Sequence, residues 1–244
     1  MSGSILVLGL GEVGRPLLEI IGQRYDVVGI DIEPVEVQGE CEIMHVCYSF
    51  GIADFIGQTV AYIDKYKPRL TVINSTVAPG TTRAIHQATG ALIAYSPVRG
   101  KHFKMKQELL HYAKFIGGIT EEAGQKAAEH FQSLGMKTKI LSSPEATELA
   151  KLTETTYFGL MIAWAQEVER YCDQLSLAYD EVVSFYEEIK FFPPVKYTPG
   201  VIGGHCIMPN IGILKTIFDT GILDAIEESN QLKIQREASP NKGK

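Results

Sequence analysis

The chain has 244 residues, of which 45% are hydrophobic and 21% are charged, a composition typical of globular proteins rather than disordered or fibrous ones. Its formal net charge of −6 argues against a nucleic-acid partner, because neutralising phosphates requires clustered Lys and Arg. Cys41, Cys47, Cys172 and Cys206 form no C-x-x-C pair, so neither a zinc knuckle nor a disulfide framework is indicated. We expect a cytoplasmic protein without a membrane partner, since the sequence contains neither a long apolar span nor a signal peptide.

The first half of the chain alternates short apolar runs with helical patterns. Strands are predicted over 5–8, 26–30, 43–47, 70–74, 91–95, 115–119 and 139–141, and helices over 13–21, 52–66 and 121–134. This alternation predicts an α/β fold, a Rossmann-like doubly wound parallel sheet with helices on both faces. The link between the second and third strands is too short for an ordinary crossover helix, so we expect it to be abbreviated.

The second half of the chain is predicted to be helical. Ser143 is a suitable N-cap for a long helix, 144–176, whose apolar residues cover more than one face. Such a surface favours a homodimer through this helix; the alternative is a central helix in a monomeric helical domain. Helices are also expected over 211–218 and 223–232. The expected domains are a Rossmann-like domain (1–142), a helical domain (143–235) and a disordered tail (236–244).

A G-x-G-x-x-G motif lies between the first predicted strand and helix, the context that a dinucleotide fingerprint requires. Its backbone N–H groups are expected to bind the pyrophosphate of NAD. A carboxylate at the end of the second strand would bind the ribose hydroxyls and repel the 2′-phosphate of NADP. The expected cofactor residues are Gly9, Gly11, Glu12, Val13, Gly14, Asp31 and Ser49. The alternative is a glycine-rich turn that binds no cofactor.

A second strand-end motif, NSTVAPGTT, covers residues 74–82. Because ligands of open α/β sheets bind at the carboxyl ends of strands, Ser75 and Thr76 are expected to face the cofactor or the substrate. Thr81 or Thr82 is expected to cap the following helix. The alternative is that these residues serve only the turn and the cap.

GLGEVG, NSTVAPGTT, EATELAKLTETTY and GVIGGHC occur in this order, and with them the chain resembles the UDP-glucose/GDP-mannose dehydrogenase family from residue 5 to about residue 230. The resemblance implies an NAD-binding Rossmann domain and a helical domain that dimerises through a long helix. It also implies oxidation of a sugar primary alcohol to a carboxylate in two hydride transfers, through a cysteine thioester. We expect this chain to lack the family's nucleotide-sugar domain.

The same resemblance assigns roles to individual residues. Cys206 matches the nucleophile, Lys151 the catalytic lysine, and Thr76 the threonine near the cofactor and catalytic water, with Gly204 in the substrate loop. A thiol just before a helix should have a lowered pKa, and a lysine can stabilise an oxyanion. The alternatives are a buried, inert cysteine and a surface lysine paired with Glu148.

Three positions differ from the family pattern. Thr155 and Asn210, both retained as candidate catalytic residues, stand where the family has asparagine and aspartate, and Val98 stands where it has glutamate. An amide cannot take a proton, so the acid/base chemistry must differ. Arg99, Lys101 and His102 form a cationic group for a phosphate or carboxylate of a smaller substrate, or alternatively a solvated basic turn.

The leading hypothesis is an NAD-dependent dehydrogenase that oxidises a primary alcohol of a sugar-like small molecule. One alternative is a catalytically degenerate, NAD-binding dimeric scaffold or regulatory subunit, which the three replacements favour. Another is an enzyme similar to β-hydroxyacid dehydrogenases, which leaves Cys206 without a role.

Overall fold

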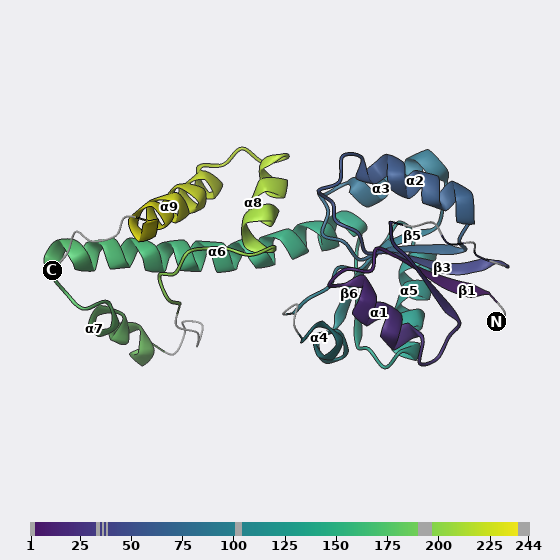
Figure 1. The fold of residues 1–244 in the computed structure, drawn as a ribbon, viewed down its shortest axis with the longest axis horizontal. Helices are drawn as coiled ribbons and strands as arrows, with labels where there is room; N and C mark the ends of the chain where they lie inside the picture. The colour runs from purple at the N-terminus through teal and green to yellow at the C-terminus, as the bar shows by residue number, and fades with distance from the viewer. Residues whose placement is uncertain are drawn as a thin grey trace. The chain divides into compact units, whose positions relative to one another are not determined.

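A computed structural model describes residues 3–32, 35, 37, 39–100, 104–189 and 197–238. The chain forms two compact units, Met1–Lys151 and Leu152–Lys244 (Figure 1). The boundary falls within the long helix α6 (Pro144–Leu175), whereas the sequence suggested a boundary before this helix. The difference arises because Glu145 and Glu148, in the first turns of α6, are bonded to the first unit.

The first unit is built on a seven-stranded sheet of order β2-β1-β3-β4-β5-β6-β7. The strands are β1 (Ser4–Leu8), β2 (Val27–Ile30), β3 (Cys41–Val46), β4 (Leu70–Ile73), β5 (Ile93–Tyr95), β6 (Lys114–Gly118) and β7 (Thr138–Leu141). The doubly wound, Rossmann-like fold is confirmed, but a wholly parallel sheet is wrong, because β5 and β6 pair antiparallel. β6 therefore begins at the edge of the sheet where β5 ends. The segment that joins them, which includes α4 (Met105–His111), starts and finishes at this same edge.

Helices cover both faces of the sheet. One core cluster contains Val7, Val72 and Phe131 and packs the sheet against α1 (Gly14–Ile21), α4 and α5 (Glu121–Ser133). The other contains Leu6, Val46 and Ile85 and packs it against α2 (Phe55–Tyr66) and α3 (Thr81–Thr89). Leu6 and Val7 enter opposite clusters because successive strand side chains point to opposite faces.

The strand order places the topological switch point at β1, because β2 and β3 flank it on opposite sides. In open α/β sheets the ligand crevice lies at the carboxyl ends of the strands at such a point. The described residues between β2 and β3 contain no helix, in agreement with the short link expected there. The carboxyl edge of β1, β3 and β4 is therefore the candidate ligand edge of this unit.

In the second unit, α8 (Ile207–Lys215) and α9 (Gly221–Ala238) lie on one side of α6 and α7 (Tyr179–Ser184) on the other (Figure 1). A short 3₁₀ helix, η2 (Phe185–Glu188), follows α7. The core of α6, α8 and α9 includes Leu152, Ala163, Ile211 and Ile226. In the part of the chain that the structure describes, no helix is long and apolar enough to cross a membrane.

Two helix limits differ from the expectations. α8 begins at Ile207 rather than residue 211, because Pro209 fits the first turn of a helix, where its missing N–H is not needed. α9 continues to Ala238, so residues 236–238 of the expected disordered tail are helical. Residues 239–244 lie outside the described residues.

Candidate active site

The glycine loop after β1 has the geometry of a phosphate cradle. Gly9 has a φ of +85°, and a Cβ on Gly14 would lie 1.7 Å from the carbonyl oxygen of Gly9. A Cβ on Gly11 would meet nothing within 4 Å, so this backbone faces open space. Val13 is the N-cap of α1, which places helix N–H groups at the end of the loop. These features fit a dinucleotide pyrophosphate, because two glycines allow tight backbone packing and the third allows close approach.

The other expected cofactor residues lie at the same edge of the sheet. Asp31 directly follows β2 and is exposed, and Glu12 is exposed in the glycine loop. Ser49, also exposed, lies shortly after β3, and its Oγ accepts a hydrogen bond from Gly51 N at 3.1 Å. Because β1, β2 and β3 are parallel neighbours, their carboxyl ends bring these residues together around the loop.

Ser75 and Thr76 follow β4 at the same edge. Ser75 is buried, and its hydroxyl donates to the carbonyl of Tyr48 at 2.6 Å, which joins the ends of β3 and β4. Thr76 is half-buried. Ser75 therefore has a structural contact that sequence reasoning did not foresee, whereas Thr76 lies next to the crevice edge.

The helix cap expected from Thr81 or Thr82 is wrong. Gly80 is the N-cap of α3, with a φ of +93°, and no side-chain cap bond comes from it. Instead the carboxylate of Glu148 accepts hydrogen bonds from Gly80 N (2.7 Å), Thr82 N (2.9 Å) and Thr82 Oγ1 (2.6 Å). A distant carboxylate thus replaces the local cap, because negative charge is favourable at a helix N-terminus.

Lys151 lies one helical turn after Glu148 and is half-buried. The N-cap predicted for this helix is confirmed, since Ser143 Oγ accepts from Ala146 N at 3.1 Å. Burial raises the pKa of Glu148, and its hydrogen bonds with α3 oppose this shift. Arg83 of α3 adds an ion pair with Glu145 at 2.5 Å. The helix that carries Lys151 is therefore attached to α3 at two points.

Lys114, at the start of β6, is a site residue that sequence reasoning missed. Its Nζ donates to the carbonyl oxygens of Ser96 (2.7 Å) and Pro97 (3.0 Å) and to Asn74 Oδ1 (3.4 Å). Only 3% of the residue is exposed, and this burial lowers its pKa to about 7. Phe131 of α5 lies below it, with the ring centroid 4.8 Å from Nζ. No local signal marks Lys114, because its position depends on the antiparallel pairing of β6.

Two buried histidines continue this polar cluster. Asn74 Nδ2 lies 3.2 Å from His45 Nδ1, and His45 Nε2 lies 3.0 Å from His130 Nε2. An amide nitrogen only donates, so Nδ1 of His45 accepts and its Nε2 donates to His130. Burial lowers the pKa of His130 to about 4 and that of His45 well below its usual value, so both rings are neutral at neutral pH.

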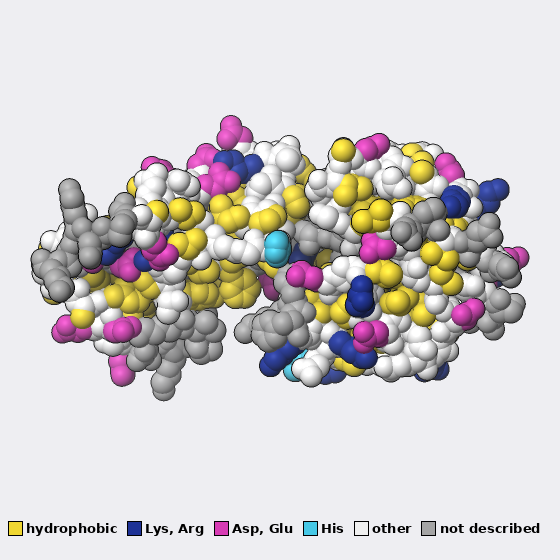
Figure 2. Space-filling view, in the orientation of Figure 1, with side chains coloured by type: hydrophobic (Ala, Val, Ile, Leu, Met, Phe, Trp, Pro, Cys, Tyr) yellow, Lys and Arg dark blue, Asp and Glu magenta, His cyan; other side chains and the backbone are white. Residues whose placement is uncertain are grey.

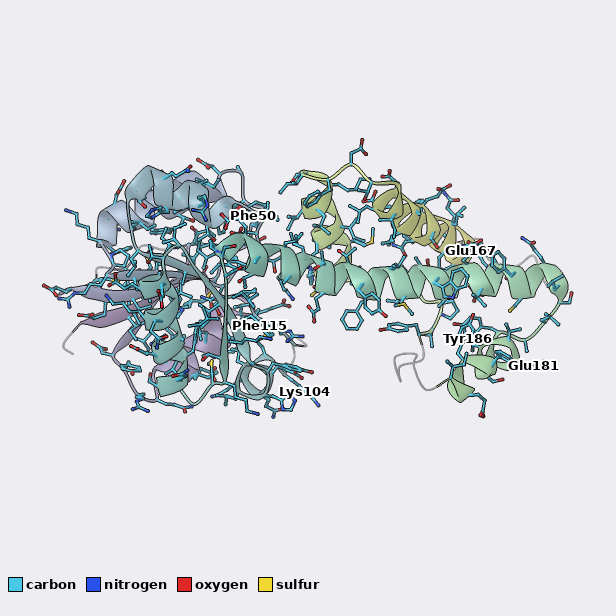
Figure 3. All side chains as sticks on the ribbon, turned by 180° about the vertical axis from the view of Figure 1, so that it is seen from behind. Phe50, Lys104, Phe115, Glu167, Glu181 and Tyr186 are labelled. Carbon is cyan, nitrogen blue, oxygen red and sulfur yellow. The ribbon has the colours of Figure 1, made fainter. Side chains whose placement is uncertain are left out.

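Arg99 follows β5 and is half-buried. The carbon of its guanidinium lies 5.5 Å from the ring centroid of Tyr112 and 5.4 Å from that of Phe115, which Figure 3 labels. These cation–π contacts hold the guanidinium near the end of β5. Val98 packs against the core cluster of α1, α4 and α5. Lys101 and His102 lie outside the described residues.

The second unit holds the cysteine loop. Cys206 is the N-cap of α8 and is half-buried, and Gly204 before it has a φ of +79°. The position of Cys206 at a helix N-terminus agrees with the expectation. Asn210 is buried one turn along α8, and its backbone N donates to Cys206 O at 3.2 Å. Thr155, on α6, is also buried.

Two amide side chains that sequence reasoning missed anchor the segment before the cysteine loop. Asn230 of α9 accepts from Ile202 N at 2.7 Å and donates to Ile202 O at 3.0 Å. Gln166 of α6 donates to Gly200 O at 2.7 Å. Both amides are buried, so the loop leading to Gly204 and Cys206 has a fixed origin on two helices. The signal in the sequence that could have identified Asn230 is an asparagine among the apolar positions of its helix.

The comparisons with known proteins agree with this architecture. The sequence profile of the UDP-glucose/GDP-mannose dehydrogenase family, central domain, matches residues 145–231. A UDP-N-acetyl-D-mannosamine dehydrogenase from Methanococcus vannielii is 29% identical over 254 residues, which cover 83% of this chain and 59% of that protein. The second half of the chain is therefore similar to the central domain of this dehydrogenase family. The chain spans less than two thirds of the length of this relative.

Solved structures extend the fold comparison beyond the central domain. A UDP-D-ManNAc dehydrogenase from Pyrococcus horikoshii superposes with a TM-score of 0.83 at 21% identity, covering 96% of this chain and 70% of that one. A 3-hydroxyisobutyrate dehydrogenase from Mycobacterium tuberculosis gives a TM-score of 0.69 at 15% identity, covering 98% and 95% of the two chains. Both comparisons show a shared fold.

Proposed function

We propose that the chain is an NAD-dependent oxidoreductase that oxidises a primary alcohol of a sugar-like substrate. The observation that carries the proposal is Cys206 at the N-terminus of α8, in a unit that matches the family's central domain, while the other unit has a glycine loop that fits a dinucleotide. A non-catalytic protein has no physical need for a glycine cradle, Thr76, Lys151 and Cys206 together. The named substrates of the relatives are nucleotide sugars, which supports a sugar-like substrate here.

The cofactor proposal rests on the first unit. The backbone of Gly9, Gly11 and Gly14, with Glu12 and Val13, would hold the pyrophosphate at the start of α1, and Asp31 would bind the adenosine ribose. A carboxylate at that position favours NAD over NADP. Bound NAD would supply the hydride acceptor. Thr76 and Ser49 complete the edge at which it would lie.

The chain's own residues would handle the substrate atoms. Lys151 would stabilise the oxyanion that develops as the alcohol loses its proton and hydride. The thiolate of Cys206 would add to the aldehyde carbon to give a thiohemiacetal. Loss of a second hydride and a proton would leave a thioester, which water cleaves to a carboxylate and the free thiol. The full route removes four electrons and reduces two NAD per alcohol.

The replaced residues set limits on this route. Asn210 cannot exchange a proton, and Val98 fills core space rather than presenting a carboxylate. We therefore expect either a two-electron oxidation that ends at the aldehyde or a slow four-electron one. Arg99 would bind a phosphate or carboxylate of the substrate, with Lys101 and His102 as further candidates.

The test is NADH formation, followed by absorbance, with NAD and a panel of UDP-sugars, GDP-mannose, sugar phosphates and small hydroxy acids. Turnover establishes a dehydrogenase, and the NADH yield per substrate separates one oxidation from two. If the wild type forms two NADH per substrate, Cys206→Ser should form only one. If the wild type forms one NADH per substrate, Cys206→Ser should form one as well. Lys151→Met should abolish turnover while NAD binding is retained. No turnover on any substrate, with NAD bound, would contradict the proposal.

The scaffold alternative is distinguished by thiol labelling near neutral pH. An activated Cys206 should alkylate rapidly, whereas the buried Cys41 and Cys172 serve as internal controls. An inert Cys206 would favour the scaffold. Turnover of small hydroxy acids alone, unaffected by Cys206→Ser, would favour an enzyme of the β-hydroxyacid dehydrogenase type, whose fold the Mycobacterium tuberculosis protein shares.

We also propose that the protein is a homodimer through α6. Hydrophobic side chains gather along this helix in the second unit (Figure 2). Trp164 is 49% exposed and Tyr171 47%, although other residues of the same helix, such as Leu152 and Ala163, lie in the core. Analytical ultracentrifugation should show a dimer, and Trp164→Glu should dissociate it. A wild-type protein that sediments only as a monomer would contradict the proposal and favour the alternative, in which α6 is the central helix of a monomeric helical domain.

A further inference from the structure

Lys114 joins the ends of two strands at the ligand edge. The antiparallel register pairs Tyr95 with Gly117, so the first residue of β6 lies beyond the carboxyl end of β5. There its ammonium contacts the carbonyls of Ser96 and Pro97 and the side chain of Asn74. These contacts fix the segments that continue into Thr76 after β4 and Arg99 after β5. The three N–H bonds of an ammonium match the three acceptors, whereas a neutral amine has only two.

The positive charge of Lys114 is nearly enclosed. Among the residues that the structure describes, no carboxylate forms an ion pair with it. The titratable groups near it are the Cys47 thiol at the end of β3 and Lys151 of α6, while His45 and His130 lie behind Asn74 and are neutral. Cys47 and Lys151 supply no negative charge, since burial raises the pKa of Cys47 to about 12. A buried ammonium without a counter-ion is costly.

The glycine loop lies close behind this charge. A Cβ on Gly14 would lie 3.2 Å from Cys47 Cβ, and Cys47 is within electrostatic reach of Lys114. An anion bound on the loop would therefore lie near Cys47, the residue that also interacts electrostatically with the ammonium. Because Gly14 and Lys114 are both buried, water screens the attraction between the two charges less than it would at the surface.

We propose that Lys114 is a positioning residue of the dinucleotide site, whose protonation is linked to the binding of the anionic dinucleotide. The inference rests on the proposed NAD binding. The bound pyrophosphate favours the ammonium form, and the ammonium form holds the ends of β4 and β5 in place. By linkage the effect is reciprocal, so protonation of Lys114 increases affinity for the dinucleotide.

The experiment is isothermal titration calorimetry with NAD and with NADH at pH 7, in buffers of different ionisation enthalpy. The slope of the binding heat against that enthalpy counts the protons taken up. In the protein without bound dinucleotide the pKa of Lys114 is about 7, so about half of the molecules carry the proton at pH 7. The wild type should therefore take up roughly half a proton for each dinucleotide that binds. Between pH 6 and pH 8 its affinity should fall about fivefold or more, a coupling of ordinary size.

Two variants separate charge from structure. Lys114→Met should bind weakly at every pH without proton uptake, and Lys114→Arg, which stays charged, should bind tightly at every pH without uptake. Lys126→Met is the matched control, because Lys126 is an exposed lysine of α5 paired with Glu122. It should behave as the wild type. If Lys114→Met does not fold, as judged by thermal melting, the arginine variant alone gives the test.

Each outcome decides the matter. Wild-type proton uptake that persists in Lys114→Met, or in Lys114→Arg, overturns the inference while NAD binding stands. Equal affinity for the dinucleotide in Lys114→Met and Lys114→Arg would show that the charge has no role. Absence of NAD and NADH binding in every protein would instead overturn the proposed function, and the inference with it.

Discussion

The carboxylate of Glu148 on α6 binds Thr82 at the start of α3 through both the backbone N–H and the hydroxyl. This contact crosses 66 residues of sequence and attaches the helix that carries Lys151 to the sheet domain. α3 begins at the end of the motif that contains Thr76. The buried carboxylate of Glu148 thus helps to position both Lys151 and Thr76.

Glu148→Ala should destabilise the protein by about 3 kcal/mol, because it leaves three buried or half-buried donors without an acceptor. Glu145→Ala is the control, since its ion pair with Arg83 is partly exposed and should be worth less than about 1 kcal/mol. Urea unfolding measures both. Similar losses for the two variants would contradict the role of Glu148 as the cap of α3.

The glycine loop offers a matched pair of substitutions. Gly11→Ala should leave the melting temperature unchanged, since its Cβ meets nothing within 4 Å, but should weaken NAD binding tenfold or more by obstructing the pyrophosphate. Gly14→Ala should lower the melting temperature, because its Cβ would lie 1.7 Å from Gly9 O. Calorimetry and thermal melting give the two readouts. Unchanged NAD affinity in a folded Gly11→Ala would show that the dinucleotide does not lie on this loop.

Asn230→Leu should loosen the cysteine loop. It leaves both Ile202 N and Ile202 O without their partners, at a cost of about 2 kcal/mol in the free energy of unfolding. The alkylation rate of Cys206 should also change, because the loop leading to it loses its anchor. Gln231→Ala, at an exposed neighbouring position on α9, should alter neither quantity. A loss of stability with an unaltered Cys206 alkylation rate would mean that Asn230 only supports the fold.

The stability of the protein should depend on pH through Lys114. Its folded pKa of about 7 is below the value of 10.5 for a free lysine, so between these values the unfolded chain binds a proton that the folded protein does not. The free energy of unfolding of the wild type, relative to Lys114→Met, should therefore rise from pH 7 to pH 9 by roughly 1 kcal/mol per unit. Below pH 7 the difference should be flat. If the free energies of unfolding of the wild type and Lys114→Met change in parallel with pH over the whole range, Lys114 has an ordinary pKa in the folded protein.

Local features of the chain were accessible from its sequence. The glycine loop, the apolar strands, the N-cap Ser143 and the helix after Cys206 depend on residues within a few positions of each other, through backbone sterics and hydrogen bonds to near neighbours. For that reason the sequence predicted the seven strands of the first unit and the long helix, whereas α4, between β5 and β6, was not predicted.

The contacts that hold the candidate site depend on tertiary structure. The antiparallel pairing of β6 brings Lys114 to the ligand edge, and no pattern in 114–118 encodes strand direction. Glu148 caps α3 and Asn230 anchors Ile202 only because packing brings distant helices to buried backbone groups that need partners. The sequence therefore predicted most of the elements and the candidate site residues, whereas long-range packing decided which polar groups hold them in place.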